Sequence, residues 1–335
     1  MRFFKAIAAA TLVLSAVACA PKPANVATTE GSSAGGDQPA KPASQLVARF
    51  DAAAGELPEG LLVSADSVYV GFAPTSRVVR VDVATGQTTP YSQLPAPGAG
   101  KGFMTGLAQS PAGELYAGLA SFVPEVQAGI YRISNAGRDV TLFAKDAALS
   151  FPNALAFDSD GALFATDSGS GSVFHIDSGG HAERWAWGDA LNGQKEACDG
   201  AGPGFAIGAN GIVVEPEAVY VVNLDKATLV KIPRLAGGAA GTPSVVAGPD
   251  CEALGGADGL VRAPDGSFVV AVNRQDKLVR VAQDGKVTTL ASGAPFDFPA
   301  TVAYRGDTLF ATNFALKSAS AGRTSAPGIV RVSMR

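Results

Sequence analysis

Four short segments of this 335-residue chain place an oxygen-bearing side chain immediately before an alternating, strand-like run. They are Glu59 in PEGLLV, Asn153 in PNALAF, Asn210 in ANGIVV and Asp258 in ADGLVR. Carboxylates and amide carbonyls are hard ligands of the kind that Ca²⁺ prefers, and the ion takes about six to eight oxygens, some of them from water. If the four side chains meet in space, they predict a binding site for a divalent cation.

A local explanation also exists for the Asn and Asp residues. Asn-Gly and Asp-Gly are common turn dipeptides, and an Asn or Asp before a strand can close an Asx-turn on its own backbone. Glu59 is a poor turn former, yet it occupies the same position, which favours the shared site. Without a cation, Glu59 and Asp258 would face each other, and the pKa of one carboxyl group would rise.

The four segments belong to a unit that is written six times between residues 45 and 335. Its clearest copy, residues 151–186, reads FPNALAFDSDGALFATDSGSGSVFHIDSGGHAERWA and contains four strand-like runs separated by turn residues. Thr105 in MTGLAQ and Thr301 in PATVAY open the two remaining units. Four strands in a unit of about 45 residues are typical of a β-propeller blade. The sequence therefore predicts an all-β fold, a six-bladed β-propeller with four-stranded antiparallel blades.

The two ends of the repeat region predict how the propeller closes. The last unit ends at GIVRVSMR after its third strand, whereas the region opens with QLVARFD, a strand that has no blade of its own. We expect this N-terminal strand to supply the missing outer strand of the last blade, which would protect a free sheet edge. In such a fold the first strand of every blade lines the central channel, so the six opening residues should converge at one mouth of that channel.

The repeat and its opening residues resemble the regucalcin and gluconolactonase family, which includes the sugar lactone lactonases, and more distantly the paraoxonases. The resemblance implies that Glu59, Asn210 and Asp258 bind one divalent metal, and that Asn153 is either a fourth ligand or a substrate contact. Asp258 would also act as general base, or orient the water that opens a lactone ring. Ca²⁺ is the expected cation, with Zn²⁺ or Mn²⁺ as alternatives.

Two departures from the family bear on the substrate. The sugar lactonases carry an Arg two residues before the third-blade Asn, where this chain has Phe151, so an apolar lactone or ester is expected rather than a polyol. The paraoxonases use a His pair near the metal. The two histidines of this chain, His175 and His181, fall within and after a third strand, away from the mouth, so a Ser-His-Asp triad is not expected either.

Four polar residues end the second strands on the same face as the mouth. Asn223, Asn273 and Asn313 are expected to contact a substrate together with Phe151 and Asn153, and Asp167 occupies the equivalent place in the third unit. The alternative is that these side chains cap their own loops.

Cys198 and Cys251 are expected to form a disulfide, because an even pair of cysteines in an exported protein is more often bridged than metal-bound. Zinc is poorly supported at this place, since no further Cys or His stands near either residue. A bridge would hold the insertion between the third and fourth units over the mouth, where it is either a lid or a surface loop.

The N-terminal region carries export signals. Residues 1–19 combine Arg2 and Lys5 with an apolar run and end in Cys19, as in a bacterial lipoprotein signal. Residues 20–44 are rich in Pro, Ala, Gly and Ser and are expected to be a disordered tether. The protein would then be lipid-anchored at the bacterial envelope, periplasmic or on the outer surface, or secreted if Cys19 is not lipidated.

Composition limits the partners. A net charge of -4 and a pI near 5.3 disfavour nucleic acid, which requires clustered basic residues. The expected partner is a small lactone or ester, membrane contact is expected only through the N-terminal lipid, and a monomer is expected. Two functions remain open: a metal-dependent hydrolase, or a non-catalytic propeller that holds a structural cation and binds a protein, peptide or glycan.

Overall fold

The computed structural model describes residues 43–64, 67–198 and 204–333. The chain divides into Met1–Lys41 and Pro42–Arg335, and only the second unit contains described residues. The signal sequence, Cys19 and all but the last two residues of the expected tether therefore lie outside the described residues. Among the residues that are described, no helix is long and apolar enough to span a membrane.

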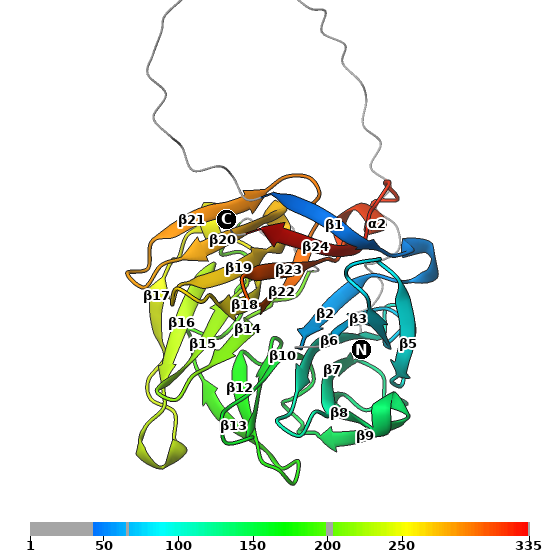
Figure 1. Cartoon of the computed structure of the whole chain (residues 1–335). Coiled ribbons are helices and arrows are strands. Elements are labelled where there is room, and N and C mark those ends of the chain that lie inside the picture. Colours follow the sequence, from blue (N-terminus) through cyan, green and yellow to red (C-terminus); the bar gives the residue numbers. More distant parts are fainter. Residues whose placement is uncertain (1–42, 65–66, 199–203, 334–335) are drawn as a thin grey trace, which may run out of the picture. The chain divides into compact units, whose positions relative to one another are not determined.

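Six four-stranded antiparallel sheets surround a central channel, which confirms the six-bladed β-propeller (Figure 1). The strands of blades one to three are β2 (Pro58–Val63), β3 (Val68–Phe72), β4 (Arg77–Val81), β5 (Thr88–Gln93), β6 (Gly102–Gln109), β7 (Leu115–Ser121), β8 (Gly129–Ser134), β9 (Asp139–Ala144), β10 (Pro152–Phe157), β11 (Leu163–Asp167), β12 (Ser172–Ile176) and β13 (Ala182–Trp187). Those of blades four to six are β14 (Ala209–Val214), β15 (Ala218–Asn223), β16 (Thr228–Pro233), β17 (Ser244–Ala247), β18 (Ala257–Arg262), β19 (Phe268–Val272), β20 (Lys277–Val281), β21 (Val287–Ser292), β22 (Pro299–Arg305), β23 (Thr308–Asn313) and β24 (Gly328–Ser333).

The N-terminal strand closes the propeller as expected. Strand β1 (Ser44–Arg49) pairs antiparallel with β24, so blade six has the order β1-β24-β23-β22. The pairing runs from Ser44 opposite Val332 to Arg49 opposite Gly328. Because the strands of blade six come from both ends of the repeat region, separating them would require the ring to open.

The hydrophobic core lies between neighbouring blades. Six clusters of buried side chains fill the six interfaces, one between each pair of adjacent sheets. In the cluster between blades six and one, Phe72 and Val70 pack with Phe310 and Ile329. Each sheet is therefore covered on both faces, which explains why β19 is buried at all five positions instead of alternating.

Small side chains let the innermost strands approach one another closely. These strands, β2, β6, β10, β14, β18 and β22, lie around the centre of Figure 1. A Cβ atom on Gly60, Gly106, Gly211 or Gly259 would overlap a backbone carbonyl of the next innermost strand. Any larger residue at these four positions would push adjacent blades apart at the channel wall.

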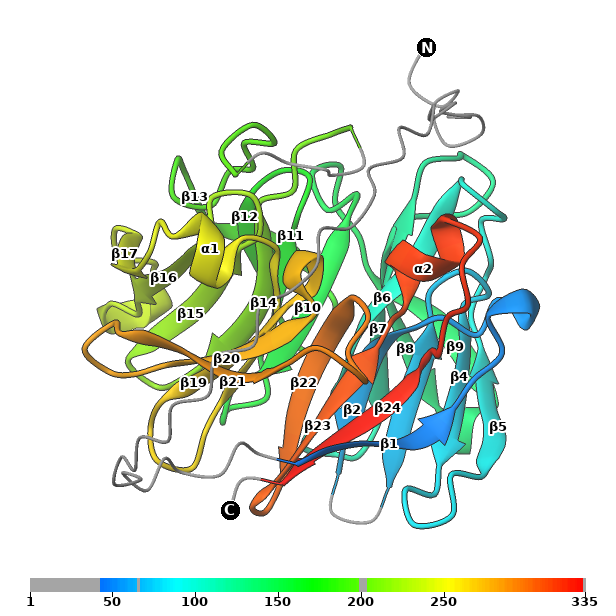
Figure 2. The ribbon, with the colours of Figure 1, turned by 90° about the horizontal axis from the view of Figure 1, so that it is seen from above.

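The few helices are short. They are η1 (Ala52–Ala54), η2 (Asn135–Gly137), η3 (Ala236–Gly238), α1 (Cys251–Leu254), η4 (Asn273–Gln275) and α2 (Leu316–Ser320). Figure 2 shows α1 and α2 on the same side of the propeller. This is the side on which the first strand of each blade begins and the second strand ends, and we call it the mouth.

Candidate metal centre

Five of the six opening residues lie buried at the mouth. Glu59, Thr105, Asn153, Asn210 and Asp258 stand at the start of the innermost strands β2, β6, β10, β14 and β18, and all five side chains are buried. In every one of these strands the pairing with the second strand of the blade shifts register at this residue. We call this the mouth position of a blade.

In blade six the mouth position is Ala300, and the sequence-based choice of Thr301 is wrong by one residue. Pro299 pairs with Asn313 and Val302 with Ala311, just as Ala257 pairs with Val272 and Leu260 with Val270 in blade five. Thr301 occupies the place of the blade-five glycine, and its hydroxyl donates to the carbonyl of Glu59 at 2.8 Å. The ring therefore has five polar side chains and one methyl group.

The register shifts explain why polar residues collect here. A bulge leaves backbone groups of the first strand without partners in the ladder. Hydroxyl groups from the second strands serve as the partners of these backbone groups. Thr166 accepts from the amide of Ala154 at 3.0 Å, and Thr312 accepts from the amide of Thr301 at 2.8 Å. Thr166 also donates to the carbonyl of Asn210 in the next blade at 2.6 Å. The mouth is thus fixed by contacts within and between blades.

Glu59, Asn210 and Asp258 come together although they belong to blades one, four and five. Asp258 accepts hydrogen bonds from Asn273, with Nδ2 to Oδ2 at 2.8 Å, and from the side chain of Asn210. Burial raises the pKa of Glu59 well above its usual range, and the nearby charge of Asp258 raises it further. Glu59 and Asn210 therefore both lie near the carboxylate of Asp258.

Burial also raises the pKa of Asp258, to about 7. The hydrogen bonds from Asn273 and Asn210 and the positive charge of Arg274 act in the opposite direction. Two ionised carboxylates this close repel each other, and a cation between them would relieve that repulsion and lower both pKa values.

Two buried oxygens at this place have no hydrogen-bond partner, Oε2 of Glu59 and Oδ1 of Asn273. Buried polar atoms are nearly always paired, so an unpartnered carboxylate oxygen next to a second carboxylate indicates a missing positive partner. The residues fit a hard cation such as Ca²⁺, which accepts carboxylate and amide oxygens. Among the described residues, no group of three or more His, Cys, Asp or Glu could hold a metal ion.

Asn153 is oriented by Ser168. Its Nδ2 donates to Ser168 Oγ at 2.9 Å, and this hydroxyl donates to the carbonyl of Ala209 at 2.7 Å. With the amide nitrogen held by Ser168, the amide oxygen faces away from that hydroxyl. This arrangement suits either expected role of Asn153, as a ligand or as a substrate contact.

The partly buried Arg274 and the fully buried Asp225 form an ion pair at the mouth that the sequence patterns did not single out. Arg274 Nη2 lies 3.0 Å from Oδ1 of Asp225, whose other oxygen accepts from the amide of Ile207 at 2.7 Å. Arg274 follows Asn273 directly, and Asp225 follows Asn223 by two residues. A search for charged residues just beyond the second strands would have found both.

Two of the expected substrate contacts have other roles. Asn223 donates to the carbonyls of Ala190 and Asn192 and accepts from the amide of Lys226. Asn313 accepts from the amide of Asp297 at 2.6 Å and donates to the carbonyl of Ala326 at 2.8 Å. Both side chains are fully buried and their amides are used within the loops, so they brace loops instead of facing a ligand.

Asp167 braces a loop in the same way, since it accepts from the amides of Phe151 and Ser170 at 2.6 and 2.7 Å. Of Asp167, Asn223, Asn273 and Asn313, Asn273 is the one whose side chain bonds the carboxylate of Asp258. Phe151 is buried at 5% exposure and lies within an aromatic cluster. His175, in the third strand β12 of blade three, packs against Phe164 of the second strand β11.

A backbone hydrogen-bond series joins blades three, four and five along the mouth. Ser168 N donates to Phe151 O, Gly208 N to Ser168 O, Leu224 N to Gly208 O, Gly256 N to Leu224 O, and Asn273 N to Gly256 O. All five bonds are between 2.9 and 3.2 Å long. At blade six the series stops, because Phe298 has a positive φ of 55° and its amide donates to the side chain of Asp276. The blades that carry Asn153, Asn210 and Asp258 are therefore tied together at the mouth.

The expected disulfide between Cys198 and Cys251 is present, with Cα atoms 5.3 Å apart. Cys251 is the first residue of α1, whose N-cap Asp250 accepts from the amide of Ala253 at 2.9 Å. Strand β18, which carries Asp258, begins shortly after this helix. The disulfide therefore ties the insertion after blade three to the segment that leads into the mouth position of blade five. Residues 199–203 of the insertion lie outside the described residues.

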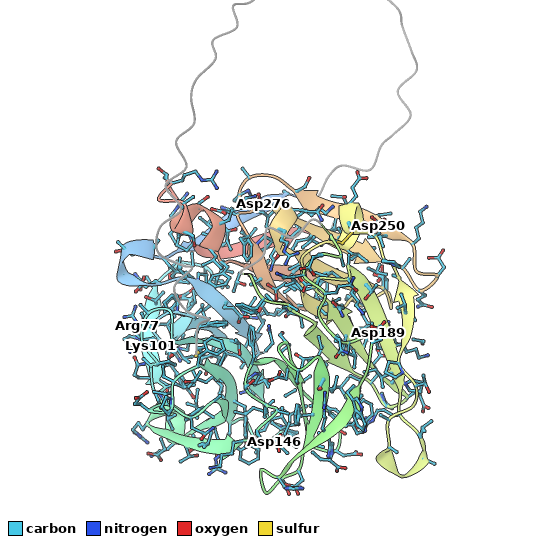
Figure 3. The ribbon with its side chains drawn as sticks, turned by 180° about the vertical axis from the view of Figure 1, so that it is seen from behind. Arg77, Lys101, Asp146, Asp189, Asp250 and Asp276 are labelled. Atoms are coloured by element: carbon cyan, nitrogen blue, oxygen red, sulfur yellow. A yellow bond between two sulfur atoms is a disulfide. The ribbon has the colours of Figure 1, made fainter. Side chains whose placement is uncertain are left out.

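Charged side chains lie around the edge of the propeller. Figure 3, seen from behind, labels six of them: Arg77, Lys101, Asp146, Asp189, Asp250 and Asp276. Several are paired, including Asp189 with Lys226 at 2.9 Å and Asp276 with Lys317 at 3.0 Å.

No family model matches the chain, and no curated protein matches it. Solved structures do. Regucalcin from Agrobacterium tumefaciens, a calcium-binding protein, has a TM-score of 0.60 at 17% identity, over 88% of this chain and 95% of that one. The PQQ-bound aldose sugar dehydrogenase from Streptomyces coelicolor has a TM-score of 0.61 at 19% identity, over 88% and 99%. An auxiliary nutrient binding protein from Bacteroides thetaiotaomicron has a TM-score of 0.63 at 11% identity, over 87% and 76%. These likenesses confirm the expected propeller fold, which is shared by proteins that differ in activity.

Proposed function

We propose that this protein is a divalent-cation-dependent hydrolase of a lactone or a related ester, with Ca²⁺ as the cation. The observation that carries the proposal is the buried pair Glu59 and Asp258, with the unpartnered Oε2 of Glu59 beside it. The fold shared with a calcium-binding regucalcin supports it. Glu59, Asn210 and Asp258 would hold the cation, and Asn153 would complete the site or contact the substrate.

When bound, the cation would polarise the ester carbonyl and stabilise the negative charge that develops on its oxygen. Asp258 would accept the proton of the attacking water. Asn273 and Asn210 fix the orientation of its carboxylate, and the charge of Arg274 favours the ionised form that a base requires. Asn153, held by Ser168, would position the substrate carbonyl with its amide.

The alternative is a binding module with a structural cation, and the nutrient-binding relative shows that this fold also occurs in proteins described by binding. The mouth favours the enzyme because Asn273 orients the carboxylate of Asp258, which would bind the cation and also stand beside the attacking water as its base.

The test is hydrolysis of a panel of lactones and aryl esters by the purified protein, before and after chelation and again after Ca²⁺ is restored. We expect turnover to be lost on chelation, to return with Ca²⁺, and to fall at least about 100-fold in Asp258→Asn. The control is Asp82→Asn, which changes an exposed carboxylate in a turn and should leave turnover as it is.

The alternative predicts a different result. If Ca²⁺ raises the melting temperature but no member of the panel is hydrolysed, the cation is structural and the face is a binding surface. Turnover that survives both chelation and Asp258→Asn would exclude the proposed mechanism.

A further inference from the structure

Four phenylalanines form a cluster beside Asn153. Phe103 and Phe151 lie 5.2 Å apart between ring centroids, Phe122 lies 6.2 Å from Phe103, and Phe205 lies 6.3 Å from Phe151. Phe103 lies at the start of β6, Phe122 follows β7, Phe151 precedes β10 and Phe205 precedes β14, so all four are on the mouth side. Phe122 and Phe205 are 38% and 40% exposed, which is unusual for large apolar side chains.

Ser168 holds both Phe151 of the cluster and the proposed substrate contact Asn153. Phe151 stands two residues before Asn153, and its carbonyl accepts from the amide of Ser168 at 3.0 Å. The hydroxyl of Ser168 in turn holds the amide of Asn153. A group bound on the phenylalanine rings is therefore next to the site where the ester would react.

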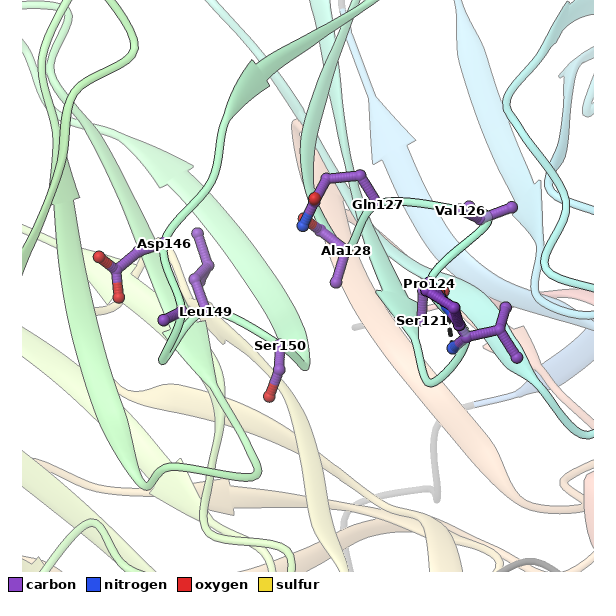
Figure 4. A pocket seen from close by; sticks show the side chains of 10 residues that line it. Ser121, Pro124, Val126, Gln127, Ala128, Asp146, Leu149 and Ser150 are labelled. Carbon is purple, nitrogen blue, oxygen red and sulfur yellow. Dashed lines mark hydrogen bonds between the residues drawn. The ribbon is translucent and has the colours of Figure 1, made fainter. Parts of the chain in front are cut away.

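A groove lies next to the segments that carry Phe122 and Phe151. It lies between the loop that follows β7 and the segment that precedes β10, and its volume is about 200 Å³ (Figure 4). Ser121 and Ser150, which line it, are the chain neighbours of Phe122 and Phe151. Its lining is mixed, with the side chains of Val123, Val126 and Leu149 beside the polar side chains of Gln127 and Asp146. Sites that enclose a whole ligand usually measure about 300–1,000 Å³, so this groove has room for a side group.

We propose that the phenylalanine cluster and the groove bind an apolar side group of the substrate, and that the substrate class is a lactone or ester carrying an alkyl or aryl substituent. The inference rests on the proposed function and adds the chemical class. A polyol would gain little from four aromatic rings, because its hydroxyl groups would lose water without finding partners. Asp146 lines the groove with a carboxylate at the edge of the propeller, which disfavours a negatively charged tail (Figure 3).

The first test compares kcat/KM for γ-decalactone, which carries a hexyl side chain, with kcat/KM for γ-butyrolactone, which carries none. We expect the unaltered protein to prefer γ-decalactone. In the double variant Phe122→Ala/Phe205→Ala, the ratio of the two kcat/KM values should be about tenfold smaller. Ser150→Trp, which fills the groove, should reduce the same ratio. Leu235→Ala removes an apolar side chain of 51% exposure that follows a third strand, on the opposite side, and should leave the ratio as it was.

A second readout does not depend on hydrolysis. Calorimetric binding of the lactam 5-hexyl-2-pyrrolidinone to the chelator-treated protein should be measurable, and about tenfold weaker in the double variant. If no lactone is hydrolysed but the lactam binds in this way, the proposed function is wrong and the apolar site stands. Equal preference for the two lactones, or lactam binding that both variants leave unchanged, would overturn the inference.

Discussion

The carboxylates of Glu59 and Asp258 are buried close together. Without a cation this closeness is unfavourable, because the two negative charges repel each other. The same closeness would allow both carboxylates to bind one cation. We predict that Glu59→Gln raises the unfolding free energy of the chelated protein by about 1–3 kcal/mol, since it removes one buried charge of the pair. The same substitution should abolish stabilisation by Ca²⁺. Thermal unfolding with chelator and with Ca²⁺ measures both effects.

The control for this prediction is Glu217→Gln, which alters an exposed carboxylate and should change neither melting temperature. Loss of stability in the chelated Glu59→Gln protein would contradict the view that the pair is strained without a cation.

The raised pKa values also predict a pH dependence. Folded Glu59 and Asp258 hold their protons more tightly than the unfolded chain does, so their contribution to stability is fully present below about pH 4. It is lost as the pH rises through the folded pKa values, about 7 for Asp258. We therefore expect the chelated protein to melt at a lower temperature at about pH 8 than at about pH 5.5, and Ca²⁺ to stabilise it more at the higher pH.

Asp258→Asn provides the comparison, because a variant without this titrating group should show a smaller loss between the two pH values. A chelated protein whose melting temperature rises steadily between them, with no such difference from the variant, would contradict the assignment.

At the scale of elements, the approach of one innermost strand to the next fixes where the ligands stand. We predict that Gly259→Ala destabilises the protein by about 1–3 kcal/mol and weakens Ca²⁺ binding, because its Cβ would overlap the carbonyl of Ala300 and displace the segment that carries Asp258. Chemical denaturation and calorimetric titration with Ca²⁺ are the measurements. Gly179→Ala, whose new Cβ would meet only a side-chain oxygen of Asp177, is the matched control.

The elements were largely predictable from the sequence, because turn residues and strand-like runs recur in every unit. The mouth position of blade six could not be predicted in this way. A bulge adds one residue to the first strand, so residues 299–301 (PAT) can be aligned with residues 58–60 (PEG) only when the strand pairing is known. Thr301 carries an oxygen, as the other opening residues of the ring do, so the sequence pattern points to Thr301 instead of Ala300.

The roles of individual loop residues were less predictable for a different reason. Asn223, Asn273 and Asn313 occupy equivalent places in their repeats, but only Asn273 turns toward Asp258. Asn223 braces the insertion after blade three, and Asn313 braces a loop of its own blade. The Arg274–Asp225 pair and the phenylalanine cluster join segments that are far apart in the sequence. Such contacts depend on packing that a repeat pattern does not contain.

At the scale of the whole molecule, β1 holds the ring closed. We predict that deletion of residues 1–49 lowers the melting temperature sharply and causes association, because β24 would become an unpaired edge and Ala48 would leave the core between blades six and one. Size-exclusion chromatography and thermal unfolding report both effects. Deletion of residues 1–42, which leaves β1 intact, is the control and should leave a stable monomer.

The proposed lipid anchor is a property of the whole chain. We predict that Cys19→Ser moves the protein from the membrane fraction to the soluble fraction of the producing bacterium, since serine cannot carry the proposed lipid. Fractionation and labelling with a fatty acid give the measurement. Unchanged membrane association would exclude this anchor.

The pairing of β1 with β24 has one more consequence. The amide of Ser333 donates to the carbonyl of Ala43 at 3.0 Å, so the first and last described residues are neighbours in space. A short linker could join them, and new termini could then be opened in the turn that precedes the outer strand of another blade. Circular permutants of this kind would place the start of the polypeptide in each blade in turn, and would show whether a blade can be split at its outer strand without disturbing the ring.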